Sequence, residues 1–243
     1  MSEQLPAGLE RLWGLADQEE SQPRLGLSLE RIVRAAVELA DADGLAAVSM
    51  SRVAERLGFA TMSLYRHVQN KDELLTLMVN EALRPPVSID EPATDWRAGL
   101  ERWCREMHAG LRRHPWIERV PVGGMIGTPS QAIWLDRGLR TLEGTGLSEQ
   151  EKADALLLLN GYVFWEARLS EDLEQASTAG EDAPAFGALL SFLADPERFP
   201  ALRRAIDAGI FDADDQDDRD ADFDWGLARV LDGLEPLVTR AGR

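Results

Sequence analysis

The chain has 243 residues, 44% of them hydrophobic and 28% charged, so it can bury a core within one large domain or two smaller ones. No apolar run approaches the roughly 20 residues of a membrane-spanning helix, and the acidic N-terminus lacks the basic head of a signal peptide. The single cysteine, Cys104, excludes an intramolecular disulfide and a thiolate metal cluster. We therefore expect a cytoplasmic protein with no membrane partner.

The formal net charge of −17 is distributed unevenly along the chain. Residues 24–84 contain eight basic and eight acidic side chains, so the rest of the chain carries the whole negative excess. Such an asymmetry indicates that the two parts of the chain have different functions. The neutral segment is the part that would repel a polyanion least. We expect an N-terminal extension (1–23), a first domain (24–84) and a larger second domain (85–243).

The neutral segment is predicted to be helical because its apolar residues recur at helical spacing. Polar residues that suit helix starts precede these stretches, and glycine or proline follows them. The expected caps are Ser28, Ser49 and Asn70, and the expected stops are Gly44, Gly58 and Pro85-Pro86. Two short helices, 50–57 and 61–67, would flank a turn at Gly58. Glu73 can complete a capping box with Asn70.

The remainder is also predicted to be helical, which makes the whole protein all-α. The expected helices are 95–113, 129–143, 148–175 and 222–239, with shorter ones at 185–193 and 200–208. Ser148 and Glu151 form another capping box. The Asp-rich stretch 212–224 lacks the glycine and terminal glutamate of a calcium-binding loop, so we expect a solvated loop. Residues 9–15, LERLWGL, either dock as an amphipathic turn or form a disordered arm.

The stretch AERLGFATMSLYRHV, residues 54–68, has the pattern of a helix-turn-helix. Ala54 is small enough for the second helix to cross closely, and Gly58 provides the backbone freedom that a sharp turn needs. The inward wedge would consist of Val53, Leu57, Phe59 and Leu64. The second helix would then present its N-terminal residues to base edges in the major groove.

Together with the following QNKDELL, this stretch resembles the signature of the TetR family of transcriptional regulators. The resemblance implies that the three-helix segment 24–84 binds double-stranded operator DNA. The DNA-contacting residues implied by position are Thr61, Met62 and Ser63 at the base-reading end, Tyr65, His67 and Lys71 at the phosphates, Ser49, Ser51 and Arg52 on the preceding helix, and Arg66 in either role. Few basic groups serve each half-site, so we expect binding to depend only moderately on salt.

The helices after residue 94 are rich in tryptophan, and the resemblance extends more loosely to the C-terminal domain of the tetracycline repressors. It implies an effector cavity between the helices, although any single tryptophan also suits plain core packing. The expected lining is Trp96, Trp103, Met107, His114, Trp116, Met125, Trp134, Asn160, Tyr162 and Trp165, with His108 as a further polar candidate. His114 lies where the tetracycline repressors place a metal-coordinating histidine. One histidine is not a metal site, so we expect no metal and no cofactor.

The resemblance also implies dimerisation through the long helices 148–175 and 222–239 as a four-helix bundle, with packing inside one chain as the alternative. The expected function is a homodimeric transcriptional repressor that a small-molecule effector releases from its operator. The alternative is a helical dimerisation or scaffold module that has lost DNA binding. The sequence contains no G-x-S-x-G, paired-histidine or phosphate-binding glycine motif, so we do not expect an enzyme.

Overall fold

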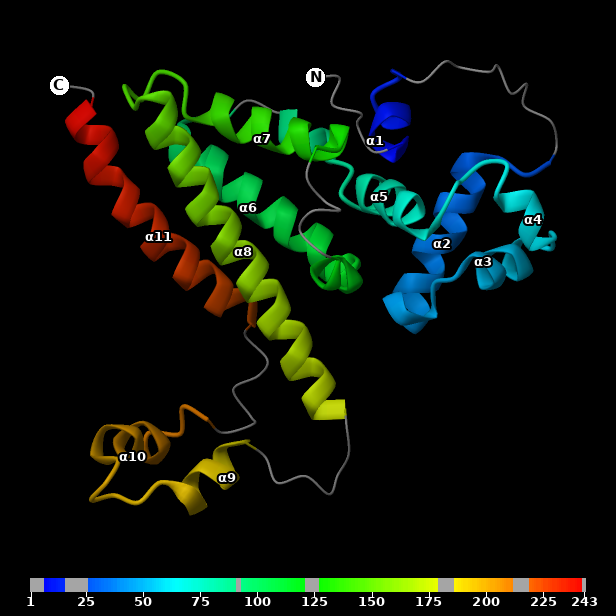
Figure 1. Ribbon diagram of the computed structural model, residues 1–243. Coiled ribbons are helices and arrows are strands. Elements are labelled where there is room, and N and C mark those ends of the chain that lie inside the picture. Colours follow the sequence, from blue (N-terminus) through cyan, green and yellow to red (C-terminus); the bar gives the residue numbers. More distant parts are fainter. Residues whose placement is uncertain are drawn as a thin grey trace, which may run out of the picture. The chain divides into compact units, whose positions relative to one another are not determined.

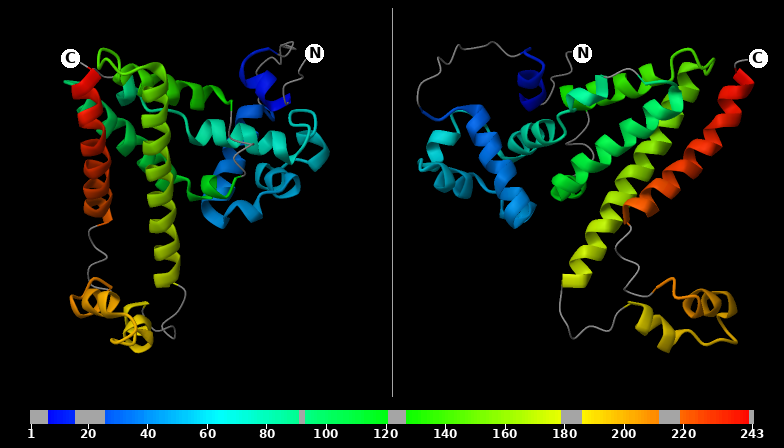
Figure 2. Two further views of the ribbon diagram at one scale, coloured as in Figure 1. Left: turned by 60° about the vertical axis from the view of Figure 1, so that its left-hand side comes forward. Right: turned by 180° about the vertical axis from the view of Figure 1, so that it is seen from behind.

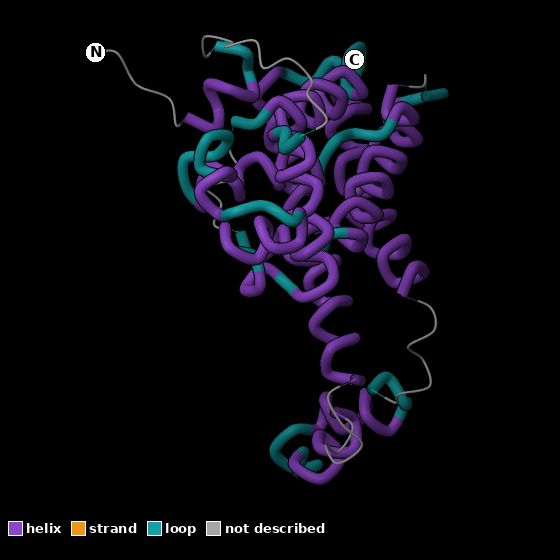
Figure 3. The backbone as a smooth tube through the Cα atoms, turned by 90° about the vertical axis from the view of Figure 1, so that its right-hand side faces the viewer, coloured by secondary structure: helices purple, strands orange, loops and turns teal. Residues whose placement is uncertain are grey.

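The computed structural model describes residues 7–15, 26–90, 93–120, 127–178, 186–211 and 219–241, and all regular structure within them is helical (Figures 1 and 3). The α-helices are α1 (Ala7–Leu12), α2 (Leu29–Asp43), α3 (Met50–Leu57), α4 (Thr61–Leu64), α5 (Lys71–Ala82), α6 (Trp96–Arg113), α7 (Pro129–Thr141), α8 (Glu149–Thr178), α9 (Phe186–Leu193), α10 (Pro200–Asp207) and α11 (Arg219–Ala241). The 3₁₀ helices are η1 (Leu45–Ala47), η2 (Val87–Asp90) and η3 (Pro115–Arg119). The predicted all-α class is confirmed.

Side-chain caps begin the helices of the neutral segment at the predicted residues. Ser28, Ser49 and Asn70 each accept a hydrogen bond from the backbone N–H three residues further on, at 3.3, 3.2 and 2.8 Å. The Glu73 carboxylate accepts a bond from the N–H of Gln69 at 2.6 Å, which completes the capping box of α5. Each such cap stabilises its helix by about 1 kcal/mol.

The capping box predicted at the start of α8 is also confirmed. The backbone N–H and the hydroxyl of Ser148 donate to the Glu151 carboxylate at 2.9 and 2.8 Å, and the Glu151 N–H donates to the Ser148 hydroxyl at 3.3 Å. The backbone N–H of Ser148 lowers the pKa of Glu151, because it favours the charged carboxylate. This exchange of bonds fixes where the long helix α8 begins.

Three predicted helix boundaries are wrong by three residues, and one of them is the end of α8, at Thr178 instead of residue 175. The loop predicted over 212–224 ends earlier, because α11 begins at Arg219; residues 212–218 lie outside the described part. Asp220 and Asp222 occupy the first turn of α11, where the helix dipole favours carboxylates. The helix predicted over 61–67 is shorter, since α4 ends at Leu64 and a turn follows.

The chain forms two compact units, Met1–Arg168 together with Leu234–Arg243, and Leu169–Gly233. Within the first unit, α2 packs against α3 and α5, and α3 packs against α4 (Figure 2). Ile32, Val53 and Leu64 are completely buried at the centre of this helix cluster. Burial of each such aliphatic side chain contributes roughly 1.5–3 kcal/mol, so this core holds the helix-turn-helix in shape.

Two tryptophans join α6, α7 and the end of α5 within the same unit. The Trp103 Nε1–H donates to the Trp134 carbonyl at 2.9 Å, and the Trp134 Nε1–H donates to the Leu83 carbonyl at 2.8 Å. A Cβ on Gly138 would lie 2.9 Å from the methyl carbons of Leu156 and 3.1 Å from Trp103 Nε1, so a side chain there would crowd both residues. Cys104 is buried beside this region, and burial raises the pKa of its thiol to about 12, so the thiol stays neutral.

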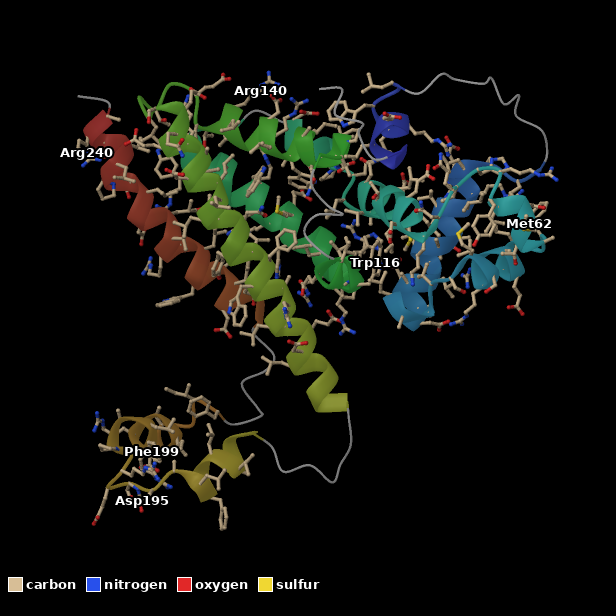
Figure 4. All side chains as sticks on the ribbon, viewed as in Figure 1. Met62, Trp116, Arg140, Asp195, Phe199 and Arg240 are labelled. Carbon is tan, nitrogen blue, oxygen red and sulfur yellow. The ribbon has the colours of Figure 1, made fainter. Side chains whose placement is uncertain are left out.

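The second unit contains α9 and α10. A Cβ on Gly187 would clash with the Phe211 carbonyl, so the chain after α10 passes directly against the start of α9. Asp195, labelled in Figure 4, orders the turn between the two helices, because its carboxylate accepts the N–H groups of Glu197 and Arg198 at 2.8 and 2.9 Å. These contacts define the local packing of the second unit.

Two glycine substitutions should change stability in opposite directions. Gly58 ends α3 with φ 74° and ψ 28°, a left-handed conformation in which alanine costs about 1–2 kcal/mol. Gly110 lies inside α6, where an added Cβ would meet no described atom within 4 Å, so alanine there should gain up to about 1 kcal/mol. Thermal unfolding should show a lower Tm for Gly58→Ala and a higher Tm for Gly110→Ala, by roughly 2–8 °C and 2–4 °C. Shifts of the same sign would contradict this account.

Candidate DNA-binding surface and effector region

Gly58 and the buried residues of α3 and α4 set the angle between these two helices. The Phe59 N–H donates to the Ala54 carbonyl at 2.9 Å, which closes the end of α3. Ala54 is 1% exposed, and Val53 and Leu64 are fully buried, so the inner faces of both helices meet without a gap for a larger residue. Leu57 and Phe59 are half-buried at the edge of this wedge. The helix-turn-helix geometry predicted from the sequence is thus present.

α4 and the turn after it direct side chains outward. Met62, labelled in Figure 4, projects from the outer edge of α4 and is 73% exposed, and Tyr65 is 46% exposed. Both side chains of this short element are therefore accessible to a partner. Among the ten predicted DNA-contacting residues, Ser51, Arg52, Met62, Tyr65, Arg66 and Lys71 are exposed, and Ser49, Thr61, Ser63 and His67 are half-buried.

The start of α3 carries a small polar network. The hydroxyls of Ser49 and Ser51 are 3.1 Å apart, and the Arg52 guanidinium pairs with the Asp43 carboxylate at 2.8 Å. Both members of this ion pair are about half exposed, so the pair contributes only about 0–1 kcal/mol. A phosphate group can therefore compete with Asp43 for Arg52.

The residues predicted to line an effector cavity fall into three groups. Trp103 and Trp134 meet edge to face, with ring centroids 6.0 Å apart and an interplanar angle of 80°. By exposure, Trp103, Met107, Trp116 and Trp134 are buried, Trp96, His114 and Tyr162 are half-buried, and Asn160 and Trp165 are exposed. Met125 lies outside the described residues. Trp165 is 65% exposed in the single chain, which suits an intermolecular contact better than a cavity wall.

His114 and Trp116 contact α2. Asp41, near the end of α2, accepts the Trp116 Nε1–H at 2.7 Å and lies 2.8 Å from the His114 Nδ1, both on the same carboxylate oxygen. Trp116 belongs to η3 and is 2% exposed, so its indole N–H depends on this acceptor (Figure 4). These two side chains therefore join η3 and the end of α6 to α2.

Sequence reasoning missed two further contacts of this kind. The Ser130 N–H donates to the Asn80 Oδ1 at 3.0 Å, and the Ser130 hydroxyl donates to the Asn80 carbonyl at 2.6 Å, which ties the start of α7 to α5. The His108 Nε2 on α6 lies 2.6 Å from a Glu166 carboxylate oxygen on α8, with side chains only 8% and 13% exposed. No local sequence spacing signals these pairs, because their members lie 50 and 58 residues apart along the chain.

Replacing Asp41 with alanine should destabilise the protein, because it leaves the buried Trp116 N–H without its acceptor. An unsatisfied buried donor costs about 1–3 kcal/mol, which should lower Tm by roughly 2–12 °C. Asp41→Asn keeps an oxygen acceptor at the same place and should lower Tm less. Differential scanning calorimetry measures both variants. An alanine variant as stable as the wild type would refute this role for Asp41.

No helix among the described residues has the length and hydropathy to cross a membrane. Within the same residues, no three His, Cys, Asp or Glu side chains gather closely enough to hold a metal ion.

A helix-turn-helix with an exposed second helix, followed by a larger helical region, defines the class of helix-turn-helix DNA-binding regulators. Comparison with known proteins agrees. Residues 32–78 match the model of the tetR family of bacterial regulatory proteins, and residues 89–238 match the tetracyclin repressor-like C-terminal domain. The chain belongs to the TetR family of transcriptional regulators. The families matched consist of regulators rather than enzymes.

Individual relatives resemble nearly the whole chain. The HTH-type transcriptional repressor DrrR1 of Streptomyces coeruleorubidus is 37% identical over 243 aligned positions, covering 96% of this chain and 86% of that protein. The class A tetracycline repressor from transposon 1721 of Escherichia coli is 31% identical and covers 84% of this chain and 88% of that protein. The solved structure of ActR from Streptomyces coelicolor in complex with actinorhodin is 30% identical, with a TM-score of 0.71, and covers 90% of this chain and 100% of that one.

Proposed function

We propose that the protein is a homodimeric cytoplasmic repressor that leaves its operator when a small molecule binds the C-terminal region. Residues 24–84 are the proposed DNA-binding domain, and residues 85–243 the proposed effector-binding and dimerisation domain. The observation that carries the proposal is the exposed surface of Met62, Tyr65 and Lys71. The segment that presents them is hydrogen-bonded, through α2 and the end of α5, to Trp116 and Trp134 of the proposed effector region. A scaffold that had lost DNA binding has no need of such a surface.

The proposed signal passes through the carboxyl end of α5. On α7, Trp134 donates to the Leu83 carbonyl, and Ser130 donates to the side-chain oxygen and the backbone carbonyl of Asn80, so a shift of α7 pulls on α5. In a dimer, movement of α5 changes the distance between the two α4 segments, which must be about 34–36 Å to engage two half-sites. The effector shifts this equilibrium only as far as it binds the released state more tightly.

The proposed effector is an apolar aromatic molecule that binds near the Trp103–Trp134 pair. The indole faces of these residues suit stacking and their edges suit edge-to-face contacts, and the nearby His108–Glu166 pair offers polar groups that can orient a ligand. The relative ActR was solved with actinorhodin, which makes this compound a reasonable first probe. The His114 Nδ1 faces Asp41, so this nitrogen is engaged in a protein contact rather than offered to a metal.

The proposed dimer contact uses the exposed apolar face of α8. Leu157, Leu158 and Trp165 are 71%, 54% and 65% exposed in the single chain. Leu157 and Trp165 are eight residues apart, about two helical turns, so they share one face. Apolar side chains of this size on one helix face are commonly covered by a partner in homodimers. Assigning Trp165 to this face removes it from the proposed cavity lining, and Asn160, which is also exposed, is dropped from that lining too.

A gel-shift experiment tests this function. DNA from the promoter regions that flank the protein's own gene should be retarded at low salt, and actinorhodin or an organic extract of the source cells should reverse the retardation. Absence of retardation on every fragment would favour the scaffold alternative. Retardation that neither ligand source reverses would contradict the effector-released mechanism.

A further inference from the structure

The N-terminal helix α1 packs along α5 (Figure 1). Gly8 is buried in this contact, and a Cβ there would lie 3.2 Å from the Glu73 Cγ and 3.5 Å from the Thr76 Cβ. The two helices therefore approach closely at position 8, where an added side chain would crowd Glu73 and Thr76. Of the two alternatives left open by the sequence, docking of residues 9–15 is the one observed.

Arg11 on α1 joins two parts of the DNA-binding segment. Its guanidinium donates to the carbonyl of His67, in the turn after α4, and lies 3.5 Å from the Glu73 carboxylate. The Glu73 side chain is only 3% exposed and also caps α5 through the Gln69 N–H. A buried carboxylate requires a counter-charge or hydrogen-bond donors, and Arg11 supplies both a charge and a donor at the junction of α4 and α5.

Trp13, just after α1, reaches the segment before α7. Its Nε1–H donates to the Gly127 carbonyl at 2.7 Å, and Leu9 of α1 also lies against Gly127. Gly127 directly precedes Thr128, the residue that caps α7. Residues 7–13 therefore contact the junction of α4 and α5 and also the start of α7. α7 is the helix whose side chains bond Asn80 and Leu83.

We propose that residues 7–13 form a strap that fixes the position of α4 relative to the effector region, with Arg11 as a positioning residue for operator binding. The Arg11 guanidinium is directed at His67 and Glu73, so it acts through the protein and contacts no phosphate. A segment held in its binding geometry before it meets DNA loses less conformational freedom on binding. This inference rests on the operator binding proposed above.

The test measures operator affinity by fluorescence anisotropy over a range of salt concentrations, well below the Tm of each full-length variant. Arg11→Ala should weaken binding about tenfold without changing the slope of log K against log[salt], because no phosphate contact is lost. Arg11→Lys should restore part of the affinity. Glu10→Ala, on the same helix, is the matched control and should bind like the wild type. Trp13→Phe, a milder change, should weaken binding about threefold at unchanged slope.

Four outcomes overturn the strap. An Arg11→Ala variant that binds within twofold of the wild type shows that Arg11 contributes to stability alone. A reduced slope for Arg11→Ala shows a phosphate contact instead of a positioning role. Equal weakening by Glu10→Ala shows a general loss of α1. If Arg11→Ala does not fold, wild-type affinity in Trp13→Phe refutes the strap. Failure of the wild type itself to bind any DNA refutes the proposed function, which the variants do not test.

Discussion

Leu157→Glu should convert the protein from a dimer to a monomer and weaken operator binding by a factor of about 100 or more. Leu157 is 71% exposed on α8, beside Leu158 and Trp165. A twofold axis through this face brings two copies of the new carboxylate together, away from water and without a counter-charge, which strongly opposes association. A monomer reaches only one half-site. Binding two linked half-sites raises the overall affinity about 10²–10⁴-fold over binding one, and the monomer loses this gain.

Sedimentation velocity measures the mass of each variant, and anisotropy measures operator affinity. Leu135→Glu is the matched control, because Leu135 is 52% exposed on α7, outside the proposed dimer face. The control should remain dimeric and bind the operator like the wild type. A Leu157→Glu protein that sediments as a dimer would show that the two chains associate through another surface.

Lys71→Ala should weaken operator binding by about 10–100-fold and flatten its dependence on salt. Lys71 is exposed in the first turn of α5, which the capping box of Asn70 and Glu73 holds in place. When Arg66 is taken in its phosphate role beside Arg52 and Lys71, a dimer makes about six ionic contacts, which predicts a slope of log K against log[salt] near −5. The variant loses one contact per chain, so its slope should be near −3.5.

Arg84→Ala is the control for charge. It removes one positive charge from the same segment, but Arg84 lies just beyond the far end of α5 and pairs with Glu81. Its slope should therefore equal that of the wild type. Equal losses for the two variants would mean that DNA responds to the total charge of the segment. A wild-type slope near −10 would mean that many more basic groups reach phosphates than the three per chain assigned here.

Local features of the fold could be predicted from the sequence because short-range physics decides them. Ser49 and Asn70 cap helices through bonds to residues three positions away, and Gly58 ends α3 because glycine adopts positive φ without strain. The spacing of Val53 and Leu64 about this turn indicated the helix-turn-helix. These signals depend on neighbouring residues only, so one sequence is enough to read them.

Long-range contacts could not be predicted in this way. Nothing in the residues around Asp41 indicates that it meets Trp116, 75 positions later, and nothing around Arg11 indicates Glu73. The exposure of Trp165 was missed for a similar reason, since apolar residues on a helix predict burial without specifying which chain provides the cover. The composition of the Asp-rich stretch does not locate its end, because Asp has weak helix propensity in general but is favourable in the first turn of a helix.

A DNase I footprint on the DNA that flanks the protein's own gene tests the central claim most directly, namely that a dimer presents two α4 segments to an operator. The prediction is protection of two related half-sites whose centres lie about 10–10.5 base pairs apart, or a multiple of this spacing, and loss of both together in Leu157→Glu. Absence of protection at low salt, or protection of one half-site with equal strength in wild type and Leu157→Glu, would contradict the claim.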